Sequence, residues 1–268
     1  MLVILFIYFL LGSVVGMLSG LLGIGGGIVV VPALAYIFKH DGVTDVNIMH
    51  FAVGTSLAIM VATTMRSLKS HLSHRGEGRK EFWRIAKKLM ATVIVGVVVG
   101  AILADFLHSN YLQIIFGVVI LLISIRMFMG NRFSKKERQL PSSQWLHVAG
   151  FFMGALSGLL GIGGGTTVIP YLLYYKVSMR IAVRVAIFVG MLVAIVGTIS
   201  YIISGYNEPL PAHCIGYIYW PAWLGTAVGS VLFAPLGVKL SYHLPTHVLR
   251  RLFSILMVLI GIHMLFFH

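Results

Sequence analysis

A block of nine residues occurs twice in this chain, at positions 19–27 and 157–165. Both copies read Ser-Gly-Leu-Leu-Gly-Ile-Gly-Gly-Gly, and a proline follows each copy five residues later. Three further pairs keep the same offset of 138 residues: Gly12 with Gly150, Gly16 with Gly154, and Tyr36 with Tyr174. A match of this length at one offset does not arise by chance, so the chain consists of two homologous halves. We expect a first transmembrane repeat over 1–130, a cytoplasmic linker over 131–143 and a second transmembrane repeat over 144–268.

The composition places both halves in a membrane. Hydrophobic residues make up 59% of the chain and charged residues only 10%, whereas about a quarter of a soluble protein is charged. A helix needs about 20 apolar residues to cross a bilayer, and the stretches 28–38 and 165–175 are roughly half that length. We therefore predict an all-α polytopic membrane protein with five hydrophobic elements per half, of which about eight cross fully and two are short, broken or re-entrant helices. The ten stretches are 1–22, 28–38, 46–65, 86–104, 110–130, 145–160, 165–175, 181–204, 214–236 and 246–267.

The charged residues indicate how these elements are oriented. The chain has 20 basic and 7 acidic residues, an excess that would suggest nucleic acid in a soluble protein but that marks topology in a membrane protein. Four segments hold 19 of the 20 basic residues, and the positive-inside rule places them in the cytoplasm. The four segments are 66–88, 126–138, 176–184 and 239–251. The two largest cytoplasmic loops are therefore 66–88 and 131–140. The weakly basic loops 39–45, 105–110 and 205–213 then lie outside, which makes the two halves inverted repeats.

The glycine blocks interrupt the helices at membrane depth, and such breaks are tolerated where they line a cavity. Discontinuous helices at matching places in inverted repeats indicate the substrate site of a transporter. Short helices that begin near Ile28 and Thr166 direct their N–H groups and positive dipole ends at that cavity, which favours an anion. The candidate substrate-binding residues are Ser19, Gly23, Gly25, Gly26, Gly27, His50, Thr55, Ser56, Ser157, Gly161, Gly163, Gly164, Gly165, Thr166, Thr167 and Arg184.

Each of these assignments has a structural alternative. The glycine block can simply allow two helices to cross at close distance. His50 can be a histidine at the membrane interface, and Arg184 can extend to the headgroups from the cytoplasmic end of its helix. The pairs Gly12/Gly16 and Gly150/Gly154 have the spacing of helix-packing motifs, and we assign them to packing.

Several functional classes are excluded. All seven carboxylates fall in loops or at helix ends, so a dedicated cation site or a carboxylate proton relay has no candidate residue. The chain contains no G-x-x-x-x-G-K-[ST], H-E-x-x-H or G-x-S-x-G motif, and a single cysteine excludes an internal disulfide framework and a thiolate metal site. We expect neither an enzyme nor a cofactor or metal, and the expected partners are a small anion and the lipid bilayer.

The duplicated S-G-L-L-G-I-G-G-G-x-x-x-x-P resembles the motif of the TauE/SafE family of sulfite exporters, and Val53-Gly-Thr-Ser56 resembles the family segment that follows it. The corresponding segment of the second half, Val189-Gly-Met-Leu192, has Met and Leu in place of Thr55 and Ser56 and so lacks their hydroxyl groups. The resemblance implies a carrier in a bacterial or archaeal plasma membrane that exports sulfite or an organosulfonate such as sulfoacetate. An anion channel-like pore and a non-transport subunit of a membrane complex remain as alternatives, and a homodimer stays open.

Overall fold

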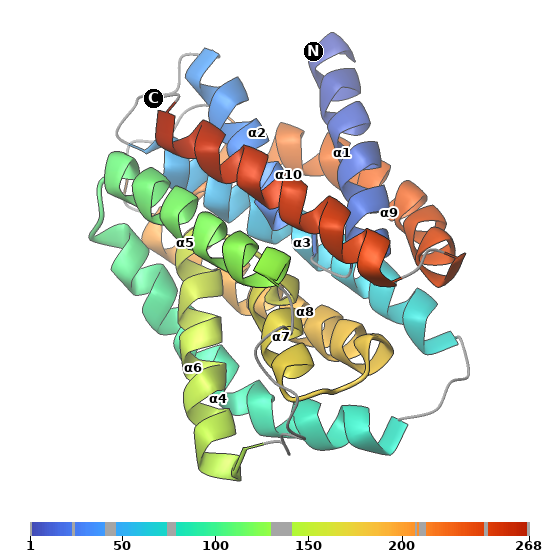
Figure 1. Ribbon diagram of the computed structural model, residues 1–268. Coiled ribbons are helices and arrows are strands. Elements are labelled where there is room, and N and C mark those ends of the chain that lie inside the picture. Colours follow the sequence, from blue (N-terminus) through green and yellow to red (C-terminus); the bar gives the residue numbers. More distant parts are fainter. Residues whose placement is uncertain are drawn as a thin grey trace.

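The described part of the chain is almost entirely helical, as a computed structural model shows (Figure 1). The structure describes residues 2–22, 25–40, 47–73, 79–129, 141–206, 208, 213–243 and 246–266. In this part of the chain there are ten helices and one two-stranded hairpin. They are α1 (Leu2–Leu22), α2 (Gly27–His40), α3 (Ile48–Ser73), α4 (Arg79–Asp105), α5 (Ser109–Met129), α6 (Ser143–Leu160), α7 (Gly164–Tyr174), α8 (Met179–Ser204), β1 (Cys214–Ile215), β2 (Ile218–Tyr219), α9 (Trp220–His243) and α10 (Thr246–Phe266).

These elements confirm an all-α membrane protein. Each predicted hydrophobic stretch corresponds to one helix, and the two short stretches form the short helices α2, with 14 residues, and α7, with 11. Among the described helices, five are long and apolar enough to cross a membrane: α1, α3, α4, α8 and α9. Shorter apolar segments lie in α2, α5 and α10.

The ninth hydrophobic stretch differs from the expectation of one helix over 214–236. Its first six residues form the hairpin β1–β2, in which Cys214 pairs with Tyr219 and Ile215 with Ile218. Gly216 begins the turn with a positive φ of 54°, a conformation that glycine adopts at no steric cost. Helix α9 therefore begins only at Trp220.

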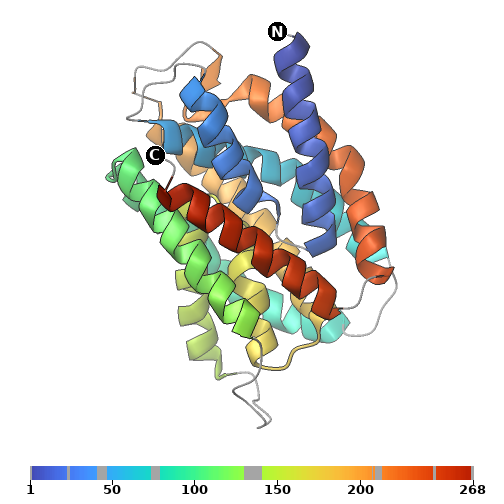
Figure 2. The same ribbon diagram turned by 45° about the horizontal axis from the view of Figure 1, so that its top comes forward.

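Glycines allow two pairs of helices to pack backbone against backbone. The pairs are α1 with α9 and α4 with α6 (Figures 1 and 2), and a methyl group on any of the glycines would collide with the partner helix. The contacts are Gly12 with Thr226, Gly16 with Ser230, Gly154 with Val93 and Gly158 with Val97. Residue numbers rise together in each pair, so the paired helices run parallel. The assignment of these glycine motifs to packing is confirmed.

Helices α3 and α8 cross the centre of the molecule in opposite directions. Contacts pair Gly54 with Tyr201, Leu57 with Gly197 and Thr64 with Gly190, so the residue number rises in one helix as it falls in the other. Helices α5 and α10 are also antiparallel, because Gly117 contacts Leu265 and Gly261 contacts Leu121. Of the five long apolar helices, α3 is the most deeply buried.

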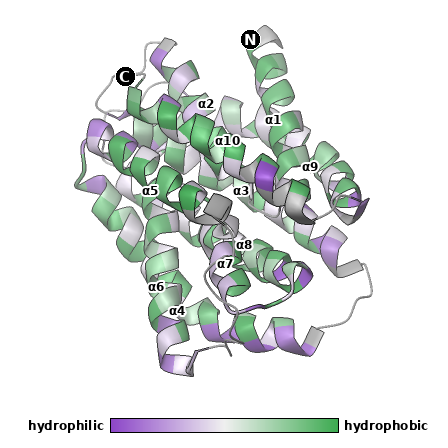
Figure 3. Cartoon of the chain, viewed as in Figure 1, coloured by the Kyte–Doolittle hydropathy of each residue, from purple (hydrophilic) through white to green (hydrophobic). Residues whose placement is uncertain are grey.

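The outer surface is apolar. Large hydrophobic side chains are exposed along α1, α5 and α10, and Figure 3 shows these helices as mostly hydrophobic while hydrophilic residues gather toward helix ends. In a soluble protein such a surface would cause association, whereas in a bilayer it faces lipid.

Candidate functional site

The two glycine breaks lie directly against each other at the centre of the molecule. One break separates α1 from α2 and the other separates α6 from α7. A methyl group on Gly27 would collide with the carbonyl oxygen of Gly161 and lie 3.1 Å from Ile162 Cα, and one on Gly25 would lie 3.6 Å from Gly163 Cα. Residues that are more than 130 positions apart in the sequence therefore form one buried site.

Glycine is required at these breaks for conformation as well as for space. Gly25, Gly26 and Gly161 have φ angles of 76°, 84° and 65°, a left-handed region that costs other residues about 1–2 kcal/mol. Gly161 ends α6 in this conformation. Gly23, the first glycine of the first block, lies outside the described residues.

The short helix α7 begins at the second break without a side chain that caps its first N–H groups. Gly163 is the N-cap of α7 and makes no side-chain cap hydrogen bond. The first N–H groups of a helix have no partner within it, so α7 offers backbone donors and its positive dipole end to the site. Gly164 and Gly165 provide the first two of these N–H groups. In α2, the carbonyl oxygen of Gly26 accepts the N–H groups of Val29 and Val30 at 3.0 and 3.1 Å.

Helix α3 connects the two breaks. Met60 lies against both Gly25 and Gly27, and Ser56 donates its hydroxyl to the carbonyl oxygen of Gly161 at 3.2 Å. On the opposite side of the second break, Gly164 packs against Gly190 of α8. The site is therefore formed by α2, α3, α7 and α8 together with the ends of α1 and α6.

The candidate hydroxyls differ in how they are engaged. Thr166 and Thr167 donate to the carbonyl oxygens of Gly163 and Gly164, at 2.7 and 3.5 Å, while Thr55 accepts the backbone N–H of Tyr219 at 3.0 Å. These contacts hold local structure in place.

Two buried serines lie near the ends of the helices that lead into the breaks. The Ser157 hydroxyl, one helical turn before Gly161, has no hydrogen-bond partner among the described residues. Ser19 is buried beside Gly26. Ser157 is thus a hydroxyl that remains able to donate to a ligand.

His50 and Arg184 lie toward opposite ends of the molecule, each a few residues before a contact with the second break. His50 precedes Val53, which contacts Gly161, by three residues or about 4.5 Å along the axis, and Arg184 precedes Ala186, whose carbonyl oxygen contacts Gly164, by two residues or about 3 Å. Because α3 and α8 are antiparallel, these displacements point in opposite directions. His50 bonds the carbonyl oxygen of Ala104 through Nε2 at 2.9 Å.

Arg184 is buried, with 7% of its surface exposed. Of the charged side chains that the structure describes, it alone is buried. Its side chain therefore does not extend freely to the headgroups.

Comparison with known proteins identifies the family. The model of the family described as sulfite exporter TauE/SafE matches residues 8–264. The chain belongs to the TauE/SafE family. It is 29% identical to a Haemophilus influenzae protein over 95% of the chain and 96% of the relative, and 30% identical to a Methanocaldococcus jannaschii protein over 96% and 93%; both are named probable membrane transporter protein. No solved structure matches the chain significantly. Family membership and the apolar helices identify a multi-pass membrane transporter.

One residue of this TauE/SafE protein that sequence analysis missed is Tyr201. Its buried hydroxyl donates to the carbonyl oxygens of Gly158 and Leu159 at 3.2 and 3.3 Å, in the last turn of α6 before the second break. These carbonyls lack partners within the helix because α6 ends there. A tyrosine in a mostly apolar helix signals such a need, since a buried hydroxyl requires a partner, but the sequence does not show which carbonyls it reaches.

Proposed function

We propose that this protein is a secondary carrier that exports a small oxyanion, either sulfite or an organosulfonate such as sulfoacetate. The observation that carries the proposal is the meeting of the two glycine breaks, where the start of α7 offers backbone hydrogen-bond donors in a buried setting. The Ser157 hydroxyl, which has no partner among the described residues, lies one helical turn before Gly161 and is the nearest candidate side-chain donor. Backbone N–H groups at helix N-termini favour anions. The choice of a sulfur oxyanion rests on the family alone.

We further propose that transport occurs by alternating access between two inverted repeats, 1–130 and 144–268, joined by a cytoplasmic linker over 131–143. Eight helices cross the bilayer in this arrangement, and α2 and α7 are half-length. Equivalent helices in inverted repeats run antiparallel, and the antiparallel pairs α3/α8 and α5/α10 support this relation. The pairs α1/α9 and α4/α6 support it too. With five helices per repeat, α1 corresponds to α6 and α4 corresponds to α9, so the pair α1/α9 in one repeat order becomes the pair α6/α4 in the other.

Flux measurements on purified protein in liposomes test the proposed function. We expect saturable uptake of sulfite or sulfoacetate, and acceleration when the same anion is loaded on the opposite side, because a carrier exposes its site to one side at a time. Flux that neither saturates nor shows exchange would favour the channel-like pore. An absence of flux for every anion tested, in liposomes that contain folded protein, contradicts both transport mechanisms.

The proposed orientation in the plasma membrane predicts which side each loop occupies. A membrane-impermeant maleimide is expected to label Glu208→Cys in intact cells and Arg180→Cys only after permeabilisation, because both side chains are exposed but lie on opposite sides. The native chain serves as the control. Burial raises the pKa of its Cys214 thiol to about 11, so at pH 7 only about 0.01% is thiolate and the background is low. The reverse labelling pattern would invert the topology.

A further inference from the structure

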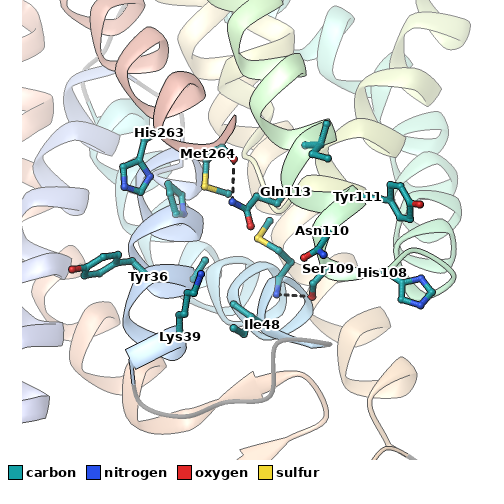
Figure 4. A pocket seen from close by; sticks show the side chains of 14 residues that line it. Tyr36, Lys39, Ile48, His108, Ser109, Asn110, Tyr111, Gln113, His263 and Met264 are labelled. Carbon is teal, nitrogen blue, oxygen red and sulfur yellow. Dashed lines mark hydrogen bonds between the residues drawn. The ribbon is translucent and has the colours of Figure 1, made fainter. Parts of the chain in front are cut away.

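A cavity of about 680 Å³ opens at the surface of the molecule. It is lined by α2, α3, α5 and α10 (Figure 4). Lys39 of α2 and Gly27 at the first break are twelve residues apart on the same helix, which corresponds to about 18 Å. Pro32, at the other end of the cavity, is five residues or about 7.5 Å from Gly27, so it is the polar end of the cavity, at Lys39, that lies away from the site proposed for transport.

Helix ends place this cavity at the level of the lipid headgroups. Helix α2 ends at His40, α3 begins at Ile48, α5 begins at Ser109 and α10 ends at Phe266. Tyr36 and Tyr111 border the cavity with 58% and 60% of their surface exposed, and in Figure 4 they point away from it on opposite sides. Exposed tyrosines are typical of the interface between membrane and water.

The polar side of the cavity is suited to an anion. Figure 4 shows Lys39 and His263 on one side and Ser109, Asn110 and His108 on the other. Lys39 supplies a positive charge, and the two histidines and the amide of Asn110 supply N–H donors. The N-terminus of the 21-residue helix α5 adds its positive dipole end. None of the described residues that line the cavity is Asp or Glu.

The remaining walls are apolar and lead to a lipid-facing surface. Pro32, Ala35, Ile48 and Ile114 line the cavity, and Ile114 continues into a row of exposed residues along α5 that includes Val118 and Leu122. A ligand with a charged head and an apolar body is therefore accommodated better than a fully hydrated ion.

We propose that this cavity binds the phosphate-type oxyanion of an anionic phospholipid headgroup, with its acyl chains along α5. Basic pockets between helices at headgroup level are recognised lipid sites on the cytoplasmic side of membranes, and in the orientation proposed above this cavity presents the same chemistry to the outer leaflet. A free inorganic oxyanion presents the same chemistry to Lys39 as a lipid phosphate, so the experiment tests both kinds of ligand.

The test measures lipid retention by the purified full-length protein in detergent, by native mass spectrometry with added phosphatidylglycerol or phosphatidylcholine. We expect phosphatidylglycerol to bind more tightly, and Lys39→Gln to weaken it about five- to tenfold, the effect of one lost charge-assisted contact. Phosphatidylcholine binding is expected to stay unchanged. Ala35→Phe, which fills the cavity without altering charge, is expected to weaken phosphatidylglycerol binding as well.

Lys239→Gln is the matched control, because Lys239 is an exposed lysine on α9 outside the cavity. A second set of measurements adds inorganic phosphate or sulfate to the lipid-bound protein. If they displace phosphatidylglycerol from the wild type, and Lys39→Gln weakens them equally, the oxyanion site stands and accepts free anions. Equal retention of the two lipids, or a Lys39→Gln variant that matches Lys239→Gln for every probe, overturns the proposal. Retention is measured without flux, so this result is independent of whether the protein exports sulfite.

Discussion

Replacing Gly27 by alanine is expected to reduce anion flux to less than a tenth of the wild-type rate. The added methyl group would collide with the carbonyl oxygen of Gly161 and crowd Ile162 Cα at 3.1 Å and Met60 Sδ at 2.9 Å. Met60 can move, but the backbone of the second break cannot move without displacing α7. Overpacking of this kind costs about 1–3 kcal/mol, and about 1.4 kcal/mol corresponds to a tenfold change. Flux per folded molecule in liposomes, together with the thermal unfolding midpoint, measures the effect.

Gly117→Ala is the matched control for this substitution. Gly117 lies between α5 and α10, where an added methyl group would meet the side chain of Leu265 at 2.8 Å and, less closely than at Gly27, the backbone carbonyl oxygen of Gly261 at 3.2 Å. A leucine side chain adjusts more readily than backbone, so this variant is expected to transport at close to the wild-type rate. Wild-type flux in Gly27→Ala would show that close contact of the two breaks is not needed for transport.

Replacing Arg184 by glutamine is expected to lower kcat/KM for the exported anion by about 10- to 100-fold, since hydrogen bonds to charged groups contribute about 1.5–3 kcal/mol. Arg184 is buried on α8, where the low dielectric strengthens its attraction for an anion. It lies two residues, about 3 Å along the helix axis, before Ala186, whose carbonyl oxygen contacts Gly164 at the second break, so we expect it to act on the anion as it enters or leaves the site. Initial rates over a range of anion concentrations measure the change.

Arg180→Gln provides the comparison, because Arg180 is one helical turn away on α8 and exposed. We expect kcat/KM of this variant to stay within about twofold of the wild type, since exposed charges contribute little. If Arg184→Gln lowers the unfolding midpoint but leaves kcat/KM per folded molecule unchanged, Arg184 has a structural role only.

Much of the helical architecture could be predicted from the sequence. Length and hydropathy located all ten helices, and the duplicated glycine block identified α2 and α7 as short elements that follow breaks. The Gly12/Gly16 motif was correctly assigned to packing. These features are local, because hydrophobic length and glycine spacing act within one segment.

Other features were decided only by the tertiary structure. The sequence grouped His50 and Arg184 with the glycine breaks, and only the antiparallel crossing of α3 and α8 shows that they lie toward opposite ends of the molecule. It gave no indication that Tyr201 bonds the end of α6, or that β1–β2 replaces the start of the ninth hydrophobic stretch. Ser56 and Ser157 are both candidate donors in the sequence, but in the structure one is bonded and the other has no partner among the described residues.

By itself, the sequence determined the membrane setting and the helices, and its repeated glycine block predicts two homologous halves, because apolar length, charge and repeated residues are properties of the chain. The tertiary structure decided which helices pair and that the two breaks touch. The physical reason is that lipid satisfies any apolar surface, so hydrophobicity does not select one partner helix over another. Selection comes from close backbone approach at small residues, such as Gly27 against Gly161, and that fit exists only once both helices are in place.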